Sequence, residues 1–119
     1  MDRVKTFEDA CKVLGIQGDI FSGILNDALA DDCQAITDHM KLIIITRALN
    51  EGWKPNWDNS NEHKYYPWFD MKKGFVLNNV NYNYLNSNVS SRLCFEKRDV
   101  AKYAAKQFFD LYKNYFTIN

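Results

Sequence analysis

The stretch from about Asp32 to Glu51 constrains the fold of this 119-residue chain more than any other segment. Its apolar residues recur at helical spacing and cover more than one face. The two sides carry Ile36, Met40, Ile43 and Arg47 on one and Leu42, Ile45 and Leu49 on the other. A helix that is apolar on more than one face packs on two sides. We therefore predict a central helix, with acids at its start and Gly52 just past its end.

Two further helices are predicted at the ends of the chain. Thr6, followed by Phe-Glu-Asp, has the pattern of a helix N-cap, and this helix should end at Gly15. Apolar residues at helical spacing also predict an amphipathic helix from about Lys97 to Phe116. The glycine-containing stretch 15–32 is interpreted as a loop with one short helical turn around 20–29.

Strand patterns lie between the central and closing helices. Lys64 to Met71 is rich in aromatics, although Pro67 confines such a strand to a sheet edge or a bulge. Lys72-Lys73-Gly74 is typical of a hairpin turn, and a return strand begins at Phe75. The Asn-rich residues 78–88 fit a strand or a long exposed loop equally, and 92–95 is a short strand candidate. The prediction is one α+β domain, 1–119, with helices packed on a small antiparallel β-meander.

Composition places the chain among ordinary globular proteins, with 46% hydrophobic and 25% charged residues. No apolar run approaches the roughly 20 residues that cross a bilayer, so we expect no membrane association. The N-terminus lacks the basic start and apolar core of a secretion signal. Cys11, Cys33 and Cys94 form no CxxC pair, which favours reduced thiols in a cytoplasmic protein.

The net charge is zero, but the two halves of the chain differ. Residues 1–60 hold six Lys/Arg and ten Asp/Glu, a net −4, whereas residues 61–119 hold nine and five, a net +4. This asymmetry could orient a partner or support head-to-tail self-association. It is too weak to identify a nucleic-acid-binding protein by itself.

No motif in the sequence nominates a catalytic residue, a cofactor or a metal. The chain lacks a nucleophile elbow, a phosphate-binding glycine loop and paired catalytic carboxylates. His39 and His63 are the only histidines and have no neighbouring ligands at metal-binding spacing. Cys94, between Leu93 and Phe95, is expected to be a buried, inert thiol. We therefore expect a protein that is not an enzyme.

All three tryptophans and both prolines fall between Trp53 and Phe69. In one interpretation these rings complete the core, with Trp53 and Trp57 folded back on the end of the central helix and Tyr65 and Trp68 beneath the sheet. In the other, some rings stay exposed and contact a ligand. Trp, Tyr and Arg are common anchors of protein interfaces. Bases of single-stranded nucleic acid also stack on such rings, while Lys54, Lys64, Lys72, Lys73 and Arg92 could meet phosphates.

From these aromatic and basic side chains we predict the residues that bind a partner. They are Trp53, Trp57, Tyr65, Trp68, Lys72, Lys73, Tyr82, Tyr84 and Arg92.

Three segments of the chain resemble a known group of proteins. These are residues 48–71, with GWKPNW and YYPWF, residues 90–116, which begin SSRLCFEKRD, and residues 6–16. They resemble small uncharacterised proteins encoded by phages and prophages of gut Bacteroidetes and related bacteria. The resemblance implies a phage accessory protein in a bacterial cytoplasm, and it supplies no activity or catalytic residue.

We expect the chain to bind a macromolecule without catalysis. A protein partner, host-encoded or a second copy of the chain, is the first hypothesis because net charge is near zero and aromatics are dense. A single-stranded nucleic-acid-binding protein is the alternative, and a small enzyme without a recognisable motif is the third.

Overall fold

The computed structural model describes residues 1–17, 30–72, 74–85 and 87–118 of the chain. Its elements, in chain order, are α1 (Phe7–Leu14), α2 (Ala30–Asn50), β1 (Lys64–Asp70), β2 (Val76–Asn83), α3 (Arg98–Gln107) and α4 (Phe109–Phe116). The α+β class with an antiparallel sheet is confirmed. No helix in the described ranges is long and apolar enough to cross a membrane. The predicted helical turn around 20–29 lies outside the described residues, as does Lys73.

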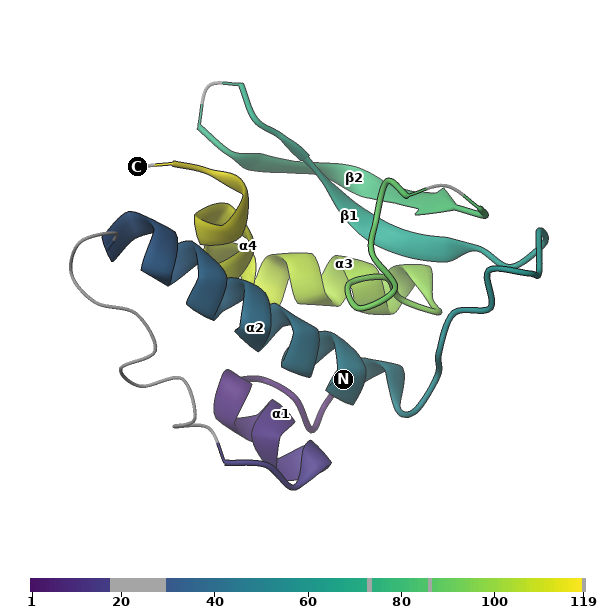
Figure 1. Cartoon of the computed structure of the whole chain (residues 1–119), viewed down its shortest axis with the longest axis horizontal. Coiled ribbons are helices and arrows are strands. Elements are labelled where there is room, and N and C mark those ends of the chain that lie inside the picture. Colours follow the sequence, from purple (N-terminus) through teal and green to yellow (C-terminus); the bar gives the residue numbers. More distant parts are fainter. Residues whose placement is uncertain (18–29, 73, 86, 119) are drawn as a thin grey trace.

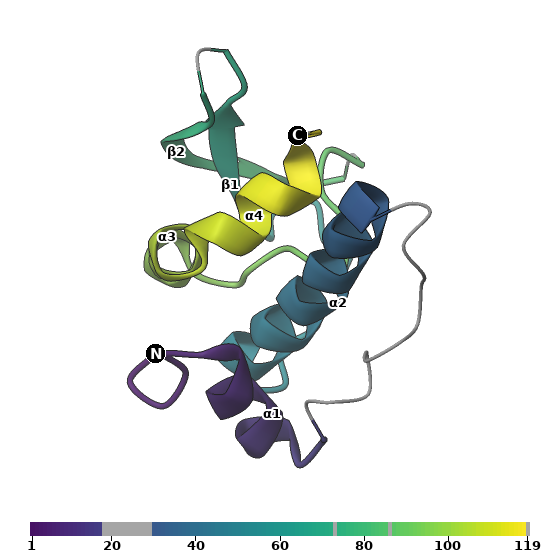
Figure 2. The ribbon, with the colours of Figure 1, turned by 90° about the vertical axis from the view of Figure 1, so that its left-hand side faces the viewer.

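Helix α2 runs through the middle of the molecule. Figures 1 and 2 show α1 on one side of it and α3 and α4 on the other, with the β1–β2 hairpin beyond α3 and α4. Helix α2 packs against α1 and α4, while α3 contacts both strands. The prediction of a helix packed on two sides is therefore confirmed.

Helix α1 begins and ends where the sequence predicts. The Thr6 side chain accepts a hydrogen bond from the Asp9 backbone N–H, and the Asp9 carboxylate accepts one from the Thr6 backbone N–H. This reciprocal capping box satisfies two N–H groups that the helix cannot pair internally. At the other end Gly15 adopts a left-handed φ of 69°, which glycine tolerates without a side-chain clash.

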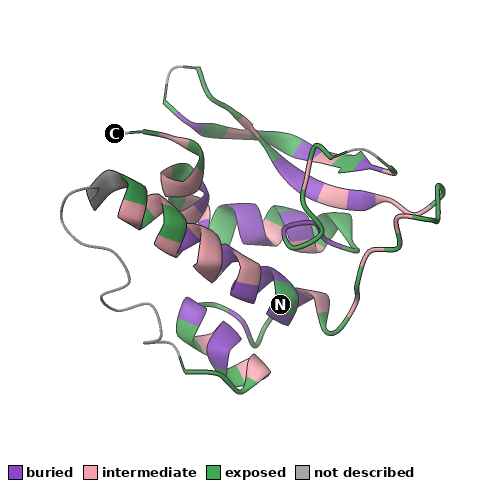
Figure 3. Ribbon diagram, viewed as in Figure 1, coloured by how far each residue is buried: buried purple, intermediate pink, exposed green. Residues whose placement is uncertain are grey.

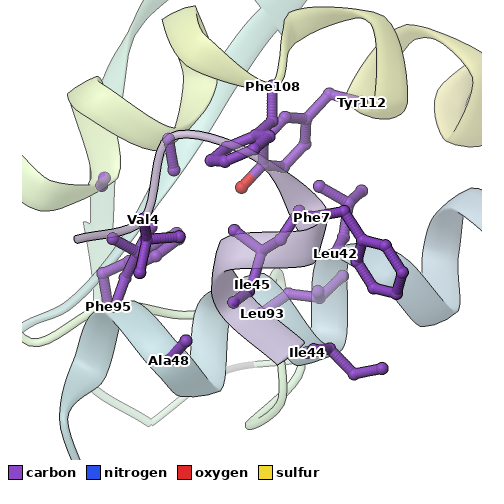
Figure 4. Packing of buried hydrophobic residues seen from close by; sticks show 14 of the residues in the cluster. Val4, Phe7, Leu42, Ile44, Ile45, Ala48, Leu93, Phe95, Phe108 and Tyr112 are labelled. Carbon is purple, nitrogen blue, oxygen red and sulfur yellow. The ribbon is translucent and has the colours of Figure 1, made fainter. Parts of the chain in front are cut away.

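One hydrophobic cluster contains side chains from the helices and from the hairpin. Figure 4 shows Ile45 and Ala48 of α2 near Phe95 and Phe108, which come from much later in the chain. Leu42 and Ile45 are fully buried, as one predicted face of α2 requires. The other face is only partly covered, because Ile36 remains 47% exposed.

The hairpin pairs Lys64 with Asn83 at its open end and Asp70 with Val76 at its turn, with a bulge between Trp68 and Phe69. A strand therefore forms through Asn83, so residues 78–83 of the Asn-rich stretch are strand, whereas residues 84, 85, 87 and 88 lie outside it. The strand candidate 92–95 is wrong in extent. It forms only an isolated bridge, in which Tyr65 and Phe95 exchange two backbone hydrogen bonds of 3.0 and 2.8 Å.

The single closing helix predicted for residues 97–116 is also wrong, because the structure breaks it at Phe108. This residue has φ −115° and ψ 32°, outside helical geometry, and separates α3 from α4. Phe108 is buried in the main cluster, whereas the Phe109 ring lies 5.4 Å from the Phe75 ring of the hairpin. An uninterrupted helix points neighbouring side chains about 100° apart, so the break lets both phenylalanines pack. Periodicity alone did not reveal this.

Candidate functional site

The chain turns sharply at the carboxyl end of α2. Glu51 and Gly52 both adopt positive φ, 51° and 90°, and the Trp53 backbone N–H donates to the Asn50 carbonyl at 3.0 Å. Positive φ is uncommon for a residue such as Glu51 and costs nothing for glycine. The predicted helix end is confirmed, although the left-handed backbone begins one residue before Gly52. The turn places Trp53 beside the last turns of α2, as the core interpretation expected.

A groove of about 830 Å³ lies along this end of α2. Four parts of the chain line it: the N-terminal residues with α1, the last turns of α2, residues 51–55 and residues 91–92. Figure 3 shows that the segment just after α2 is largely exposed or only partly buried. The volume of the groove is that of a typical ligand-binding site. We call this site the α2 groove.

Four cationic side chains line the α2 groove: Arg3, Arg47, Lys54 and Arg92. All four are exposed, and they come from four different parts of the chain. Glu51 is the single acidic residue that the described residues contribute to the lining. Among the residues that the structure describes, no carboxylate lies within ion-pair distance of the four cations. The described lining therefore carries a net positive charge.

Between these cations the groove has an apolar lining. Val13, Leu14 and Ile43 are half-buried there, and Trp53 and Pro55 are half-buried on the side of the loop. Thr46 also lines the groove. It is 1% exposed, and its hydroxyl has no hydrogen-bond partner. Buried polar groups are nearly always paired, so this hydroxyl is an exception that a ligand could explain.

Lys64 forms a second, buried site, which we call the lysine hub. Its ammonium nitrogen, fully buried, donates to the backbone carbonyls of Asn56 (2.8 Å), Asn59 (3.1 Å) and Tyr84 (3.0 Å). The Glu62 carboxylate lies 3.4 Å away, and the Trp57 ring centroid 5.0 Å away. All three ammonium protons thus have acceptors, which makes burial of the charge tolerable. The lysine hub fixes the loop between α2 and β1.

A cluster around His63 lies next to the lysine hub. The His63 ring stacks on Tyr82, with centroids 4.3 Å apart, and its two nitrogens are hydrogen-bonded to the hydroxyls of Tyr65 and Tyr84. Desolvation raises the pKa of Tyr84, so this hydroxyl keeps its proton. Because both nitrogens are occupied, neither can bind a metal or accept a substrate proton without losing a contact. The arrangement stabilises the open end of the hairpin.

The structure separates the predicted binding residues. Trp53 and Arg92 line the α2 groove. Trp57 donates through its indole N–H to the Ser91 hydroxyl at 2.6 Å and covers the lysine hub. Tyr65, Tyr82 and Tyr84 surround His63.

The remaining predicted residues lie on the hairpin. Trp68 is 46% exposed, so the interpretation that places it beneath the sheet is wrong. It pairs with Asn79, whereas Tyr82 pairs with Tyr65. Since successive strand residues alternate between faces, Trp68 and Tyr82 lie on opposite faces of the hairpin and form no common platform. Lys72 is exposed at the hairpin turn.

Sequence reasoning missed Arg3 and Arg47 as binding residues. Arg47 carried a weak signal, since a cation in the last turn of a helix, beside a Gly-Trp turn, lies near whatever follows that helix. Arg3 carried none, because its place in the groove depends on how the N-terminus packs. That packing is fixed by the Tyr103 hydroxyl, which donates to the Val4 carbonyl at 2.6 Å.

No protein-family model, curated protein or solved structure matches the chain. Within the described residues, no group of three or more His, Cys, Asp or Glu side chains could hold a metal ion. Cys94 is fully buried as expected, and burial raises its pKa to about 11, so its thiol stays protonated and unreactive.

Proposed function

We propose that this chain is a non-catalytic binding protein that receives a segment of a partner protein in the α2 groove. One observation carries the proposal: four exposed cations, with no carboxylate partner in the part of the chain that the structure describes, surround an apolar, solvent-open lining. Interface anchors are typically Trp, Tyr and Arg side chains gathered near the centre of the contact surface. Trp53, Arg47 and Arg92 are side chains of these types in the lining of one groove.

The groove cations contribute little to the stability of the chain itself. Exposed charges typically change stability by less than about 0.5 kcal/mol, whereas like charges gathered in one place repel each other. The loop beside the groove is instead fixed by Lys64. Because the cluster adds little to folding, we attribute it to the binding of a partner.

A single-stranded nucleic acid is the second candidate, favoured by the position of Trp53 among four cations. A base could stack on this indole while the cations meet phosphates. Strand binding usually needs a row of stacking rings, however, and the exposed rings of Trp68 and Tyr82 lie on opposite faces of the hairpin. The protein partner therefore accounts for more of the geometry.

The resemblance to small phage and prophage proteins suggests where the partner comes from. We propose a phage accessory protein that acts in the bacterial cytoplasm on a host-encoded protein. A second copy of the chain is the other possible partner, and sedimentation of the purified protein over a range of concentrations distinguishes the two.

The test compares two tryptophan variants as baits in a lysate of a gut Bacteroidetes host. Trp53→Ala removes the indole from the groove, and Trp68→Ala removes an exposed indole on the hairpin as the matched control. We expect a stoichiometric protein to be captured by the wild type and by Trp68→Ala, and lost from Trp53→Ala. Binding should then be reproduced with the two purified proteins.

Both variants must retain cooperative thermal unfolding for the comparison to count. Equal capture by the two variants would contradict a role for the α2 groove. Capture of no protein, together with tight binding of an oligonucleotide, would favour the second candidate.

A further inference from the structure

We infer that the α2 groove binds an acidic, amphipathic peptide segment, whose carboxylates pair with the groove cations while an apolar side chain sits on the lining. This inference rests on the proposed function and names the chemistry of the partner. Three observations carry it: the identity of the cations, the composition of the lining and the helix end that borders the groove.

Three of the four groove cations are arginines. A guanidinium presents a planar fork of N–H donors that matches a carboxylate and binds it through two parallel hydrogen bonds. Arg3, Arg47 and Arg92 come from different parts of the chain but line one groove. Because all three line a single groove, one bound segment can contact more than one of them. Acidic side chains at several positions of one segment are the complementary pattern.

The lining favours a peptide over a nucleic-acid strand. Val13, Leu14 and Ile43 offer aliphatic surface, which an aliphatic side chain covers well and a sugar–phosphate backbone does not. The buried Thr46 hydroxyl belongs to the same wall and has no hydrogen-bond partner. A polar group of a bound segment could become that partner after a small adjustment of the wall. Cations around an apolar surface are complementary to an amphipathic segment that has both carboxylates and apolar side chains.

The carboxyl end of α2 provides the third argument. The last residues of this helix, Arg47 to Gly52, border the groove. Helix carboxyl ends carry partial negative charge on carbonyl oxygens that lack helical partners. The Ala48 and Asn50 carbonyls already accept from the Glu51 and Trp53 backbone N–H groups. Carbonyls that stay unpaired can accept hydrogen bonds from peptide N–H groups, which a sugar–phosphate backbone does not have, while their partial negative charge disfavours carboxylates and phosphates alike. A peptide satisfies both the cations and the helix end.

The experiment measures fluorescence anisotropy with a labelled 12-residue peptide that contains nine Glu and three Leu. The same peptide with Gln in place of Glu and a labelled 12-nucleotide oligothymidine are the comparison probes. At about 50 mM salt we expect the acidic peptide to bind at least tenfold more tightly than either. Its affinity should fall severalfold at about 300 mM salt, because the pairs are exposed and screened.

Charge-reversed variants locate the binding site. Arg47→Glu/Arg92→Glu changes two groove cations, and Lys72→Glu/Lys102→Glu makes the same change in net charge at two exposed lysines that do not line the groove. We expect a loss of at least tenfold for the first pair and less than twofold for the second. If Arg47→Glu/Arg92→Glu does not fold, Arg47→Gln/Arg92→Gln replaces it, with an expected loss of about fivefold.

Three results would overturn the inference: equal binding of the Gln peptide, equal losses for the two double variants, or tighter binding of oligothymidine. Failure of the inference is distinct from failure of the proposed function. A lysate protein captured in a Trp53-dependent manner, but unaffected by Arg47→Glu/Arg92→Glu, would leave the proposed function standing and remove the acidic partner. Absence of any Trp53-dependent capture would remove the proposed function itself.

Discussion

Lys64 and the four cations of the α2 groove carry the same charge in opposite surroundings. The Lys64 ammonium is fully buried, hydrogen-bonded to three backbone carbonyls and adjacent to Glu62. The groove cations are exposed and have no carboxylate partner among the described residues. Lys54 and Lys64 are only ten residues apart in the chain, yet one faces solvent and the other holds the loop together. Charge type alone therefore does not separate binding residues from structural ones, whereas burial and pairing do.

Replacing the hub lysine should have the largest effect. Lys64→Met keeps most of the length of the side chain but leaves three buried carbonyls without the ammonium donor and Glu62 without its cationic partner. We expect a loss of about 3 kcal/mol in the free energy of unfolding, typical of removing one member of a buried charged network. Urea denaturation followed by circular dichroism measures it.

Lys54→Met is the matched control, because it makes the same change in the exposed groove lysine. Its free energy of unfolding should stay within about 0.5 kcal/mol of the wild type. Similar losses in both variants would break the distinction between a structural hub and a groove available for binding.

One polar side chain in the wall of the groove, that of Asn50, stabilises the fold through two hydrogen bonds. The Asn50 amide donates to the Cys94 carbonyl at 2.9 Å, and its oxygen accepts from the Glu96 N–H at 3.3 Å. Asn50→Ala should cost about 2 kcal/mol in the free energy of unfolding, since two backbone groups lose their partner. Thermal or urea unfolding tests this, with the exposed Asn88→Ala as a control that should change stability by less than about 0.5 kcal/mol.

The sequence predicts the parts of the fold that local signals determine. The Thr6 capping box, the Gly15 and Gly52 helix ends and the hairpin turn near Gly74 each depend on a few neighbouring residues. The break at Phe108 was not predictable in this way, because it depends on where two consecutive phenylalanines find partners in the folded chain.

The candidate site was predictable only in part, for the same reason. Trp53 and Arg92 were selected because aromatic and basic side chains suit binding, but nothing local places them in one groove. Arg3 reaches that groove through the packing of the N-terminus, some ninety residues away from Arg92 in the chain. Lys64 was predicted as a phosphate contact, and the structure instead buries it. Long-range packing decides whether a basic side chain lies in the groove or is buried, and local sequence signals do not contain that information.

Removing the unpartnered hydroxyl in the groove wall should have a smaller effect of opposite sign. Thr46→Val replaces a buried hydroxyl that lacks a partner by a methyl group of similar volume. We expect the free energy of unfolding to rise by about 1 kcal/mol, since the desolvation cost of the hydroxyl disappears. Tyr112→Phe, which removes the second unpartnered buried hydroxyl that the described residues contain, at a position outside the groove, should also stabilise the chain.

Binding separates the two hydroxyls. If a bound segment pairs with Thr46, then Thr46→Val should weaken the acidic peptide severalfold while Tyr112→Phe leaves its affinity unchanged. Destabilisation by Thr46→Val would instead mean that the hydroxyl has a partner within the folded chain.

The smallest expected effect is on the pH dependence of stability, which distinguishes core packing from groove charge. Burial lowers the pKa of His39, whose ring lies 4.4 Å from the ring of Tyr115. The unfolded chain, with an ordinary histidine pKa of about 6.5, then binds a proton more readily than the folded chain. The stabilisation is complete above about pH 6.5 and is lost as the pH falls toward the lowered pKa. Urea midpoints between about pH 7.5 and 5.5 should therefore decline, and less so for His39→Gln.

The groove arginines keep their charge throughout this range, so the affinity of the folded protein for the acidic peptide should not follow that decline. A wild-type curve parallel to that of His39→Gln would show that the His39 ring titrates alike in both states.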